Sequence, residues 1–131
     1  IIVLSSTAGT ARAVAREWRA KGLKVGVLKP RVYRPFPAKA IVEAIRNCKS
    51  VAVLDRASSP GSAHGMGPLF TDIASALYVR HACDVIVVNY VYGLGGRDTV
   101  PPMIESVYRD LEKIASEGAG GDKVRYLGLR E

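Results

Sequence analysis

The chain has 131 residues, of which 48% are hydrophobic and 24% are charged, which is the size and composition of one soluble globular domain with a buried core. No apolar run approaches the roughly 20 residues that a membrane helix needs, and no signal peptide is visible, so we expect a cytoplasmic protein without a membrane partner. The net charge of +7 raises the question of nucleic-acid binding. However, the basic residues are dispersed and no aromatic-and-basic platform is recognisable, so we expect no nucleic-acid partner.

The amino-terminal third alternates apolar runs with helical patterns. Residues 1–4 predict a buried strand, and the small residues 5–10 form a turn into a helix with an apolar face at helical spacing, made of Ala11, Val14, Ala15 and Trp18. Residues 24–28 predict a second strand. A proline-rich segment, 29–37, leads into a second helix that begins at its last proline, with an apolar face of Ile41, Ala44, Ile45 and Cys48.

The chain is organised around residues 51–70. Val51 to Asp55 form an apolar run without polar alternation, which is typical of a strand covered on both faces at the centre of a parallel sheet. The loop that follows is rich in Ser and Gly, so it buries little. Pro68 then opens a third helix, with an apolar face of Phe70, Ile73, Ala74 and Leu77. In an open α/β sheet such a loop lies at the carboxyl edge of the strands, where these folds bind ligands or partners.

The remaining segments continue this alternation. Residues 84–90 predict a fourth strand, and residues 92–102 form a second glycine-rich loop. Residues 124–129 predict a short last strand at an edge, after a long helix with an apolar face of Ile104, Val107, Tyr108, Leu111 and Ile114. The order of strands and helices predicts right-handed crossovers and an α/β fold with a parallel sheet. It also places both glycine-rich loops at the same edge of that sheet.

Few side chains in these loops could carry chemistry. A hydrolase triad of Ser62, His64 and Asp55 lacks a GxSxG elbow and is crowded into one loop, so we do not favour it. A metal site at His64 is equally weak because His81, the other histidine, lies beyond a whole helix. The turn at residues 5–10 lacks both GxGxxG and the lysine of a P-loop, so we interpret it as an ordinary strand-to-helix turn.

The cysteines and the Arg97–Asp98 pair also have structural interpretations. Cys48 and Cys83 have no CxxC spacing, so we expect them to be small buried hydrophobic residues rather than metal ligands or redox groups. Arg97 and Asp98 follow two glycines. We interpret them as a local ion pair that fixes the loop, or as an interface contact, rather than as a substrate clamp.

Three motifs stand out in this order along the chain: KVGVLKPRVYRPFP at 24–37, VAVLDR at 51–56 with its Gly/Ser continuation into GPLF at 67–70, and GLGGRD at 93–98. Together they resemble the second core domain of pyruvate:ferredoxin oxidoreductases. In archaeal multi-subunit versions, this domain is the carboxy-terminal part of the alpha subunit. The resemblance covers nearly the whole chain, so we expect residues 1–131 to be a single domain and the carboxy-terminal fragment of a longer alpha subunit.

The resemblance implies a fold like the carboxy-terminal domain of transketolase, a three-layer α/β/α sandwich with a mostly parallel sheet and one antiparallel edge strand. It also implies an enzyme that decarboxylates pyruvate on thiamine diphosphate, passes electrons through iron-sulfur clusters to ferredoxin, and transfers the acetyl group to coenzyme A. In this family, thiamine diphosphate and its magnesium lie between two other domains, and cysteines elsewhere hold the clusters. We therefore expect this domain to hold no catalytic residue, cofactor or metal, and to be inactive when isolated.

The expected partners are other domains and subunits of the oxidoreductase, with ferredoxin reached only through the holoenzyme. We expect the contacts to come from the two glycine-rich loops, with Arg97 and Asp98 as polar anchors. The interface candidates are Arg56, Ser58, Ser59, Gly61, His64, Gly67, Gly95, Gly96, Arg97 and Asp98.

The sequence departs from the family pattern in two places. Val100 precedes Pro101 where we expect a capping Thr, so we expect Thr99 to cap the last long helix. The loop around His64 is also longer or differently composed than in the family.

An alternative is a stand-alone small-ligand or nucleotide-binding α/β module that uses the same loop edge, and a basic nucleic-acid-binding module ranks third. The sequence does not separate pyruvate from other 2-oxoacids, because the residues that would recognise the substrate side chain belong to other domains.

Overall fold

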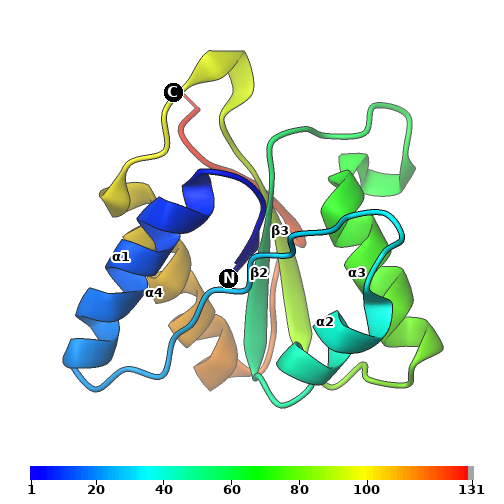
Figure 1. Cartoon of the computed structure of the whole chain (residues 1–131), viewed down its shortest axis with the longest axis horizontal. Coiled ribbons are helices and arrows are strands. Elements are labelled where there is room, and N and C mark those ends of the chain that lie inside the picture. The colour runs from blue at the N-terminus through cyan, green and yellow to red at the C-terminus, as the bar shows by residue number, and fades with distance from the viewer. Residues whose placement is uncertain (130–131) are drawn as a thin grey trace.

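The computed structural model describes residues 1–129 and contains a four-stranded sheet between two layers of helices (Figure 1). The strands, in their order across the sheet, are β1 (Ile2–Val3), β2 (Ser50–Asp55), β3 (Ile86–Val91) and β4 (Val124–Tyr126). All neighbouring pairs are parallel, and β2 is internal because it pairs with both β1 and β3. The predicted α/β fold with a mostly parallel sheet is therefore confirmed. The antiparallel edge strand implied by the resemblance does not occur among the described residues.

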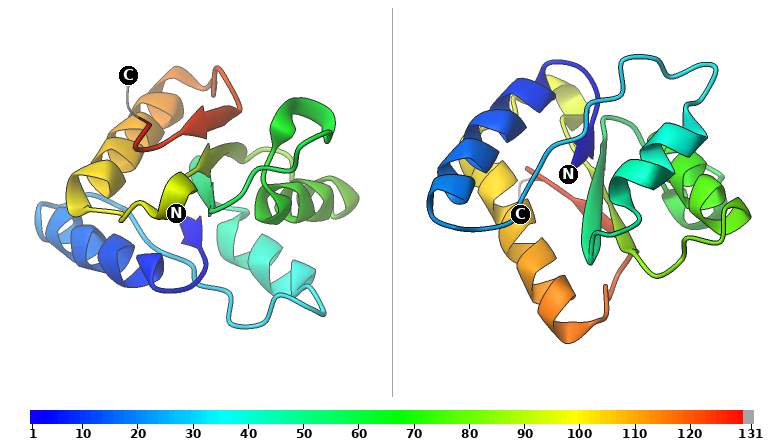
Figure 2. Two further views of the ribbon diagram at one scale, coloured as in Figure 1. Left: turned by 90° about the horizontal axis from the view of Figure 1, so that it is seen from above. Right: turned by 60° about the horizontal axis from the view of Figure 1, so that its bottom comes forward.

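Four α-helices form the outer layers. One face of the sheet is covered by α1 (Thr7–Ala20) and α4 (Pro101–Glu117), and the other by α2 (Ala38–Ile45) and α3 (Pro68–Val79) (Figures 1 and 2). Short 3-10 turns, η1 (Ala63–Gly65) and η2 (Leu94–Gly96), lie in the loops after β2 and β3. This is the expected α/β/α sandwich. None of the helices described within residues 1–129 has the length and apolar character needed to cross a bilayer.

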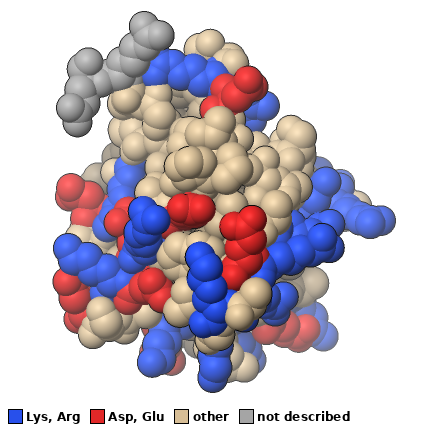
Figure 3. Space-filling model, turned by 90° about the vertical axis from the view of Figure 1, so that its left-hand side faces the viewer, with Lys and Arg blue, Asp and Glu red and all other residues tan. Residues whose placement is uncertain are grey.

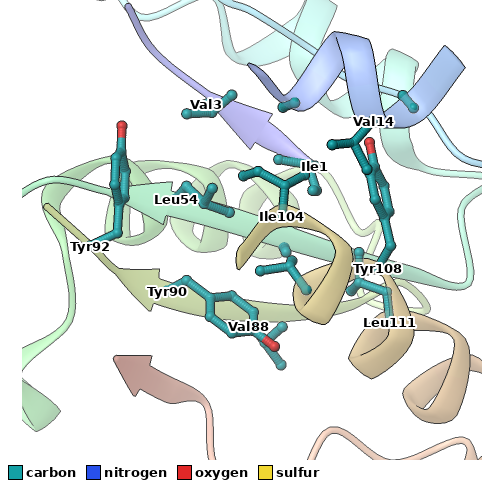
Figure 4. Close-up of a cluster of buried hydrophobic side chains, with 14 of the residues drawn as sticks. Ile1, Val3, Val14, Leu54, Val88, Tyr90, Tyr92, Ile104, Tyr108 and Leu111 are labelled. Carbon is teal, nitrogen blue, oxygen red and sulfur yellow. The ribbon is translucent and has the colours of Figure 1, made fainter. Parts of the chain in front are cut away.

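Each layer of helices buries its own hydrophobic cluster, because successive residues of a strand face opposite sides of the sheet. On the α1/α4 side, the rings of Trp18 and Tyr108 pack with their centroids 5.4 Å apart. Figure 4 shows Leu54 and Val88 of the sheet in this cluster with Ile104 of α4. All the apolar residues predicted for the first and last long helices are buried here, so both predicted helix faces are confirmed.

The second cluster lies between the sheet and the α2/α3 layer. Ile73 of α3 and Val53 of β2 have no exposed surface, and Ile41 of α2 is 3% exposed. Removing such side chains from water is the main favourable contribution to folding, at about 25 cal/mol per Å² of apolar surface.

The predicted strand over residues 24–28 is only partly formed. The segment lies beside β1, where Leu28 accepts a hydrogen bond from the Val3 N–H at 3.1 Å and donates one to the Ile1 carbonyl at 2.8 Å. The rest of the segment forms no ladder, because β1 offers only two residues for pairing and Lys24 and Gly26 are exposed. The prediction of a full strand was therefore wrong.

The proline-rich segment that follows is tied to α3. The Tyr33 hydroxyl donates to Oδ2 of Asp72 at 2.6 Å, and the Arg34 guanidinium donates to the same oxygen at 3.0 Å. The guanidinium of Arg34 also lies 4.2 Å from the centre of the Tyr33 ring. This segment, which has little regular structure, is therefore held against α3 by side-chain contacts.

The structure corrects the expectation of buried cysteines. Cys48 and Cys83 are both exposed and both free. The predicted apolar face of the second helix fails at the same point, because α2 ends at Ile45 and Cys48 lies beyond it. The buried residues of α2 are Ile41, Val42 and Ile45.

β4 lies at one edge of the sheet and is shorter than the predicted 124–129. It is fastened to the rest of the domain by Arg125, which donates to Oδ2 of Asp110 at 3.0 Å and to the Tyr90 hydroxyl at 3.1 Å. The Tyr90 hydroxyl in turn donates to Asp110 at 2.6 Å. One cluster of three side chains therefore links β3, β4 and α4.

Candidate interface at the carboxyl edge of the sheet

The loops after β2 and β3 meet at the carboxyl edge of the sheet, which is viewed from above in the left panel of Figure 2. The Tyr92 N–H donates to the Asp55 carbonyl at 2.9 Å, which holds the starts of the two loops side by side. A side chain on Gly93 would lie 3.1 Å from Nε of Arg56. The prediction that both glycine-rich loops emerge at one edge is therefore confirmed.

Asp55, the last residue of β2, caps α3 from inside the protein. It is 5% exposed, and its carboxylate accepts hydrogen bonds from the Leu69 N–H at 2.9 Å and the Phe70 N–H at 3.1 Å. These N–H groups lie in the first turn of α3 and have no acceptor within the helix. Gly67 makes this approach possible, because a Cβ there would lie 2.2 Å from Cγ of Asp55.

Asn89 of β3 completes the network. Its Nδ2 donates to Asp55 at 2.9 Å and to the Val53 carbonyl at 3.1 Å, while its Oδ1 accepts from the Gly67 N–H at 2.8 Å. Asn89 has no exposed surface. A single Asn in an apolar strand that ends at the same edge as Asp55 is a signal of a buried polar contact, but no local pattern indicates its partners.

The surroundings stabilise the charge of this network only in part. Burial raises the pKa of the Asp55 carboxyl above its ordinary value, and the hydrogen bonds from Leu69, Phe70 and Asn89 oppose that effect. Every buried side-chain nitrogen or oxygen in the described part of the chain has a hydrogen-bond partner. We therefore interpret the network as structural, because its buried side-chain polar atoms already have hydrogen-bond partners within the protein.

The residues considered for a hydrolase or a metal site are not brought together. Ser62 donates to the Ser59 carbonyl at 2.7 Å, and the Asp55 carboxylate is engaged with α3. His64 is exposed, and His81 follows the far end of α3. No three His, Cys, Asp or Glu side chains within residues 1–129 gather closely enough to hold a metal ion.

Arg56 is the first residue of the loop after β2 and lies over a buried aromatic ring. Its guanidinium carbon is 5.9 Å from the centre of the Tyr92 ring, within the range of a cation–π contact. Tyr92 is 1% exposed, and its hydroxyl lies 3.1 Å from Oγ1 of Thr7. The ring therefore offers Arg56 a rigid support.

Arg97 and Asp98 do not form the ion pair that we considered. Arg97 donates instead to the Gly128 carbonyl, and both side chains are exposed. The expected cap at Thr99 is also wrong, since Val100 is the N-cap residue of α4 and this helix has no capping hydrogen bond from a side chain in the described part of the chain. Pro101 and Pro102 have no N–H, so this helix start has less need of a cap than most.

The other interface candidates differ in exposure. Gly61, Gly95 and Gly96 are exposed, as are Arg56, His64, Arg97 and Asp98. Ser58 and Ser59 are half-buried, and Gly67 is buried against Asp55. The edge thus combines a buried polar base with exposed glycine-rich loops above it.

A separate groove of about 670 Å³ runs between α3 and the β3–β4 side of the sheet. Its walls are largely apolar, and His64 and Lys123 add polar groups. Of the interface candidates, all of which lie within residues 1–129, His64 alone lines this groove. The groove is therefore a second concave surface, distinct from the edge network.

The face over α1 and α4 carries charges of both signs, as Figure 3 shows. Some of them pair along α4, with Arg109 3.3 Å from Glu105 and Lys113 3.9 Å from Glu117. A nucleic-acid site needs a continuous basic surface, and this face does not provide one.

Comparison with known proteins identifies the family. Residues 1–104 match the family described as pyruvate:ferredoxin oxidoreductase core domain II. The pyruvate synthase subunit PorA of Thermotoga maritima is 42% identical over 131 residues, which is all of this chain and 32% of the relative. PorA of Methanosarcina barkeri is 40% identical with the same coverage. The ketoisovalerate oxidoreductase subunit VorA of Pyrococcus abyssi is 35% identical over 127 residues, covering 97% of this chain and 31% of the relative.

The chain thus spans about a third of the length of the curated relatives it matches. The resemblance carried by the three sequence motifs is confirmed, and the parallel α/β architecture agrees with it. The chain belongs to the pyruvate:ferredoxin oxidoreductase core domain II family.

Proposed function

We propose that this chain is core domain II of a thiamine-diphosphate-dependent 2-oxoacid:ferredoxin oxidoreductase, and that it serves as a structural and interface domain. The observation that carries this proposal is the carboxyl edge of the sheet. Its buried polar side chains, Asp55 and Asn89, are fully engaged in holding the start of α3 and the end of the loop after β2. A catalytic acid or base needs a polar atom within reach of the substrate, and the exposed loops above are better suited to contacts with neighbouring domains.

The reaction proposed for the holoenzyme converts pyruvate, coenzyme A and oxidised ferredoxin into acetyl-coenzyme A, carbon dioxide and reduced ferredoxin. The choice of pyruvate is supported by two relatives that are named pyruvate synthase subunits, at 42% and 40% identity. A relative named for ketoisovalerate is 35% identical. We therefore assign the recognition of the substrate side chain to other domains.

The residues of this chain do not fit the cofactors expected in the holoenzyme. An iron-sulfur cluster is usually held by four cysteine thiolates, whereas this chain has two cysteines. A magnesium site needs several oxygen ligands, and the described residues bring no such group together. We place thiamine diphosphate, magnesium, the iron-sulfur clusters and coenzyme A in the other domains, and we expect ferredoxin to dock there.

The test is purification from the source under mild conditions, with mass spectrometry of the proteins that copurify with this chain. We expect an iron-containing complex that reduces a viologen dye only when pyruvate and coenzyme A are both supplied. Omitting either substrate is the matched control. A colourless preparation without such partners would refute the oxidoreductase assignment.

The second candidate is a small-ligand module, which the groove beside α3 favours, because its 670 Å³ falls within the range of ligand pockets. In that case the 131-residue chain alone would bind a small apolar molecule. A thermal-shift screen of fragments against the chain separates the two proposals. A fragment that binds in the groove should stabilise the wild type but not an Ala74→Trp variant, in which the larger side chain narrows the groove. The interface proposal predicts that no fragment behaves in this way.

A further inference from the structure

The Arg56 guanidinium has an aromatic ring on one side and the backbone of a glycine on another. Its guanidinium lies over the buried Tyr92 ring, and a Cβ on Gly93 would lie 3.1 Å from Nε and 3.3 Å from one terminal nitrogen. Because Gly93 has no side chain, the Arg56 guanidinium can lie close to its backbone.

Within residues 1–129, the same guanidinium has no acceptor. Arg56 takes part in none of the side-chain hydrogen bonds or ion pairs found within residues 1–129. The other arginine of these loops differs, because Arg97 donates to the carbonyl of Gly128. Arg56 is thus exposed, with its donors available.

The edge around Arg56 carries a positive electrostatic field. The two exposed loops, 56–66 and 92–100, contain two arginines and a single acidic residue, Asp98. The N-termini of α1 and α4 also face this edge, and neither has an acidic residue in its first turn. Each helix N-terminus contributes about half a positive charge. In contrast, the N-terminus of α3 is already neutralised by Asp55.

We propose that Arg56 binds a carboxylate side chain, Asp or Glu, on a neighbouring subunit of the oxidoreductase. This inference rests on the proposed function. A guanidinium can donate two parallel hydrogen bonds to a carboxylate, and stacking on an aromatic ring leaves those in-plane donors free. Arg56 therefore takes the anchoring role that the sequence had suggested for Arg97 and Asp98.

The test uses the full subunit that contains this chain, coexpressed with its partner subunits, and measures the dissociation constant of the assembly at fixed salt. Arg56→Gln should weaken association about tenfold or more, since tenfold is close to the lower limit for the loss of a close charge pair. The matched control is Arg16→Gln in the middle of α1, which removes an equally exposed arginine without an ion pair and should change the constant less than about twofold. Arg56→Lys should recover only part of the loss, because an ammonium cannot donate in two parallel directions.

A second variant changes the position of Arg56 while keeping its charge. Gly93→Ala crowds the guanidinium and, because Gly93 has a φ of +66°, also strains the loop that carries it, so it should weaken association too. The melting temperature shows whether the domain still folds. Equal association of wild type and Arg56→Gln, in a complex that still copurifies, would overturn this inference and leave the proposed function standing. Failure of the wild-type subunit to associate would instead count against the proposed function. Unchanged association together with loss of inorganic phosphate binding in Arg56→Gln, followed by ³¹P NMR, would overturn the inference in favour of a phosphate ligand.

Discussion

Replacing Asp55 with Ala tests whether this carboxylate holds the carboxyl edge together. The change leaves the N–H groups of Leu69 and Phe70 and the Nδ2 of Asn89 without their acceptor. Each buried donor that loses its acceptor costs about 1–3 kcal/mol. The variant also avoids the cost of burying the Asp55 carboxylate, the cost that raises the pKa of this group in the wild type. We therefore expect the free energy of unfolding to fall by about 3 kcal/mol, toward the lower end of that sum.

The assay is urea unfolding of the 131-residue chain followed by circular dichroism. Asp98→Ala is the matched control, because it removes an exposed carboxylate at the same edge and should change stability by less than about 0.5 kcal/mol. Asp55→Asn keeps the shape of the side chain, yet its amide can accept at most two of the three hydrogen bonds, so it should fall between wild type and Asp55→Ala. If Asp55→Ala were as stable as its control, the edge network would not hold the fold.

Four further predictions concern other parts of the domain. Gly67→Ala places a Cβ 2.2 Å from the carboxyl carbon beneath it and should cost about 3 kcal/mol or more in urea unfolding, so a loss below about 1 kcal/mol would contradict the packing. Tyr90→Phe removes the hydroxyl that links β4 to α4, so it should lower the free energy of unfolding by about 1 kcal/mol and speed amide hydrogen exchange in β4. Unchanged exchange in β4 would argue against the link. Burial raises the pKa of Tyr108 from 10.0 to about 12, so the folded protein holds the phenol proton more tightly than the unfolded chain does. The stability that this protonated phenol contributes is complete below pH 10 and is lost as the pH rises toward 12. Tyr108→Phe should therefore flatten the decline of unfolding free energy between pH 10 and 12, whereas a decline parallel to that of wild type would refute this assignment. Cys48 and Cys83 are exposed, so a thiol reagent should modify both in the native protein, and a count below two would show that one is protected.

Much of the fold could be predicted because its strands and helices have strong local patterns. The run from Val51 to Asp55 has no polar alternation and became the internal strand β2. The helical spacing around Trp18 and Tyr108 likewise placed both residues in the core. Such patterns report burial directly, because an apolar run or stripe must face other apolar groups.

The failures occurred where tertiary contacts decide the outcome. Residues 24–28 have β-branched content, but the short β1 gives them too little backbone to pair with. Cys48 continues the apolar spacing of the second helix, yet the helix ends before it. Periodicity does not reveal where a neighbouring element ends.

The candidate edge was predicted in outline and missed in detail. Two glycine-rich loops after parallel strands had to emerge together, and they do. The partners of Asp55 and Arg56 lie 14 to 37 residues away in the chain, so no local pattern encodes them. Asn89 escaped for the same reason, since an isolated Asn indicates a buried polar contact without naming its partner.

The central claim is that this domain supports the oxidoreductase without taking part in its chemistry. The most direct measurement is the kcat of the assembled holoenzyme when His64, Arg97 and Asp98, the titratable side chains exposed on the two loops with Arg56, are replaced together by Ala. Our account predicts that kcat for pyruvate- and coenzyme-A-dependent dye reduction, expressed per assembled complex, stays within about twofold of wild type, because these groups do not touch the reacting atoms. A fully assembled complex whose kcat falls by about 100-fold or more, the range of a lost general acid or base, would contradict that claim.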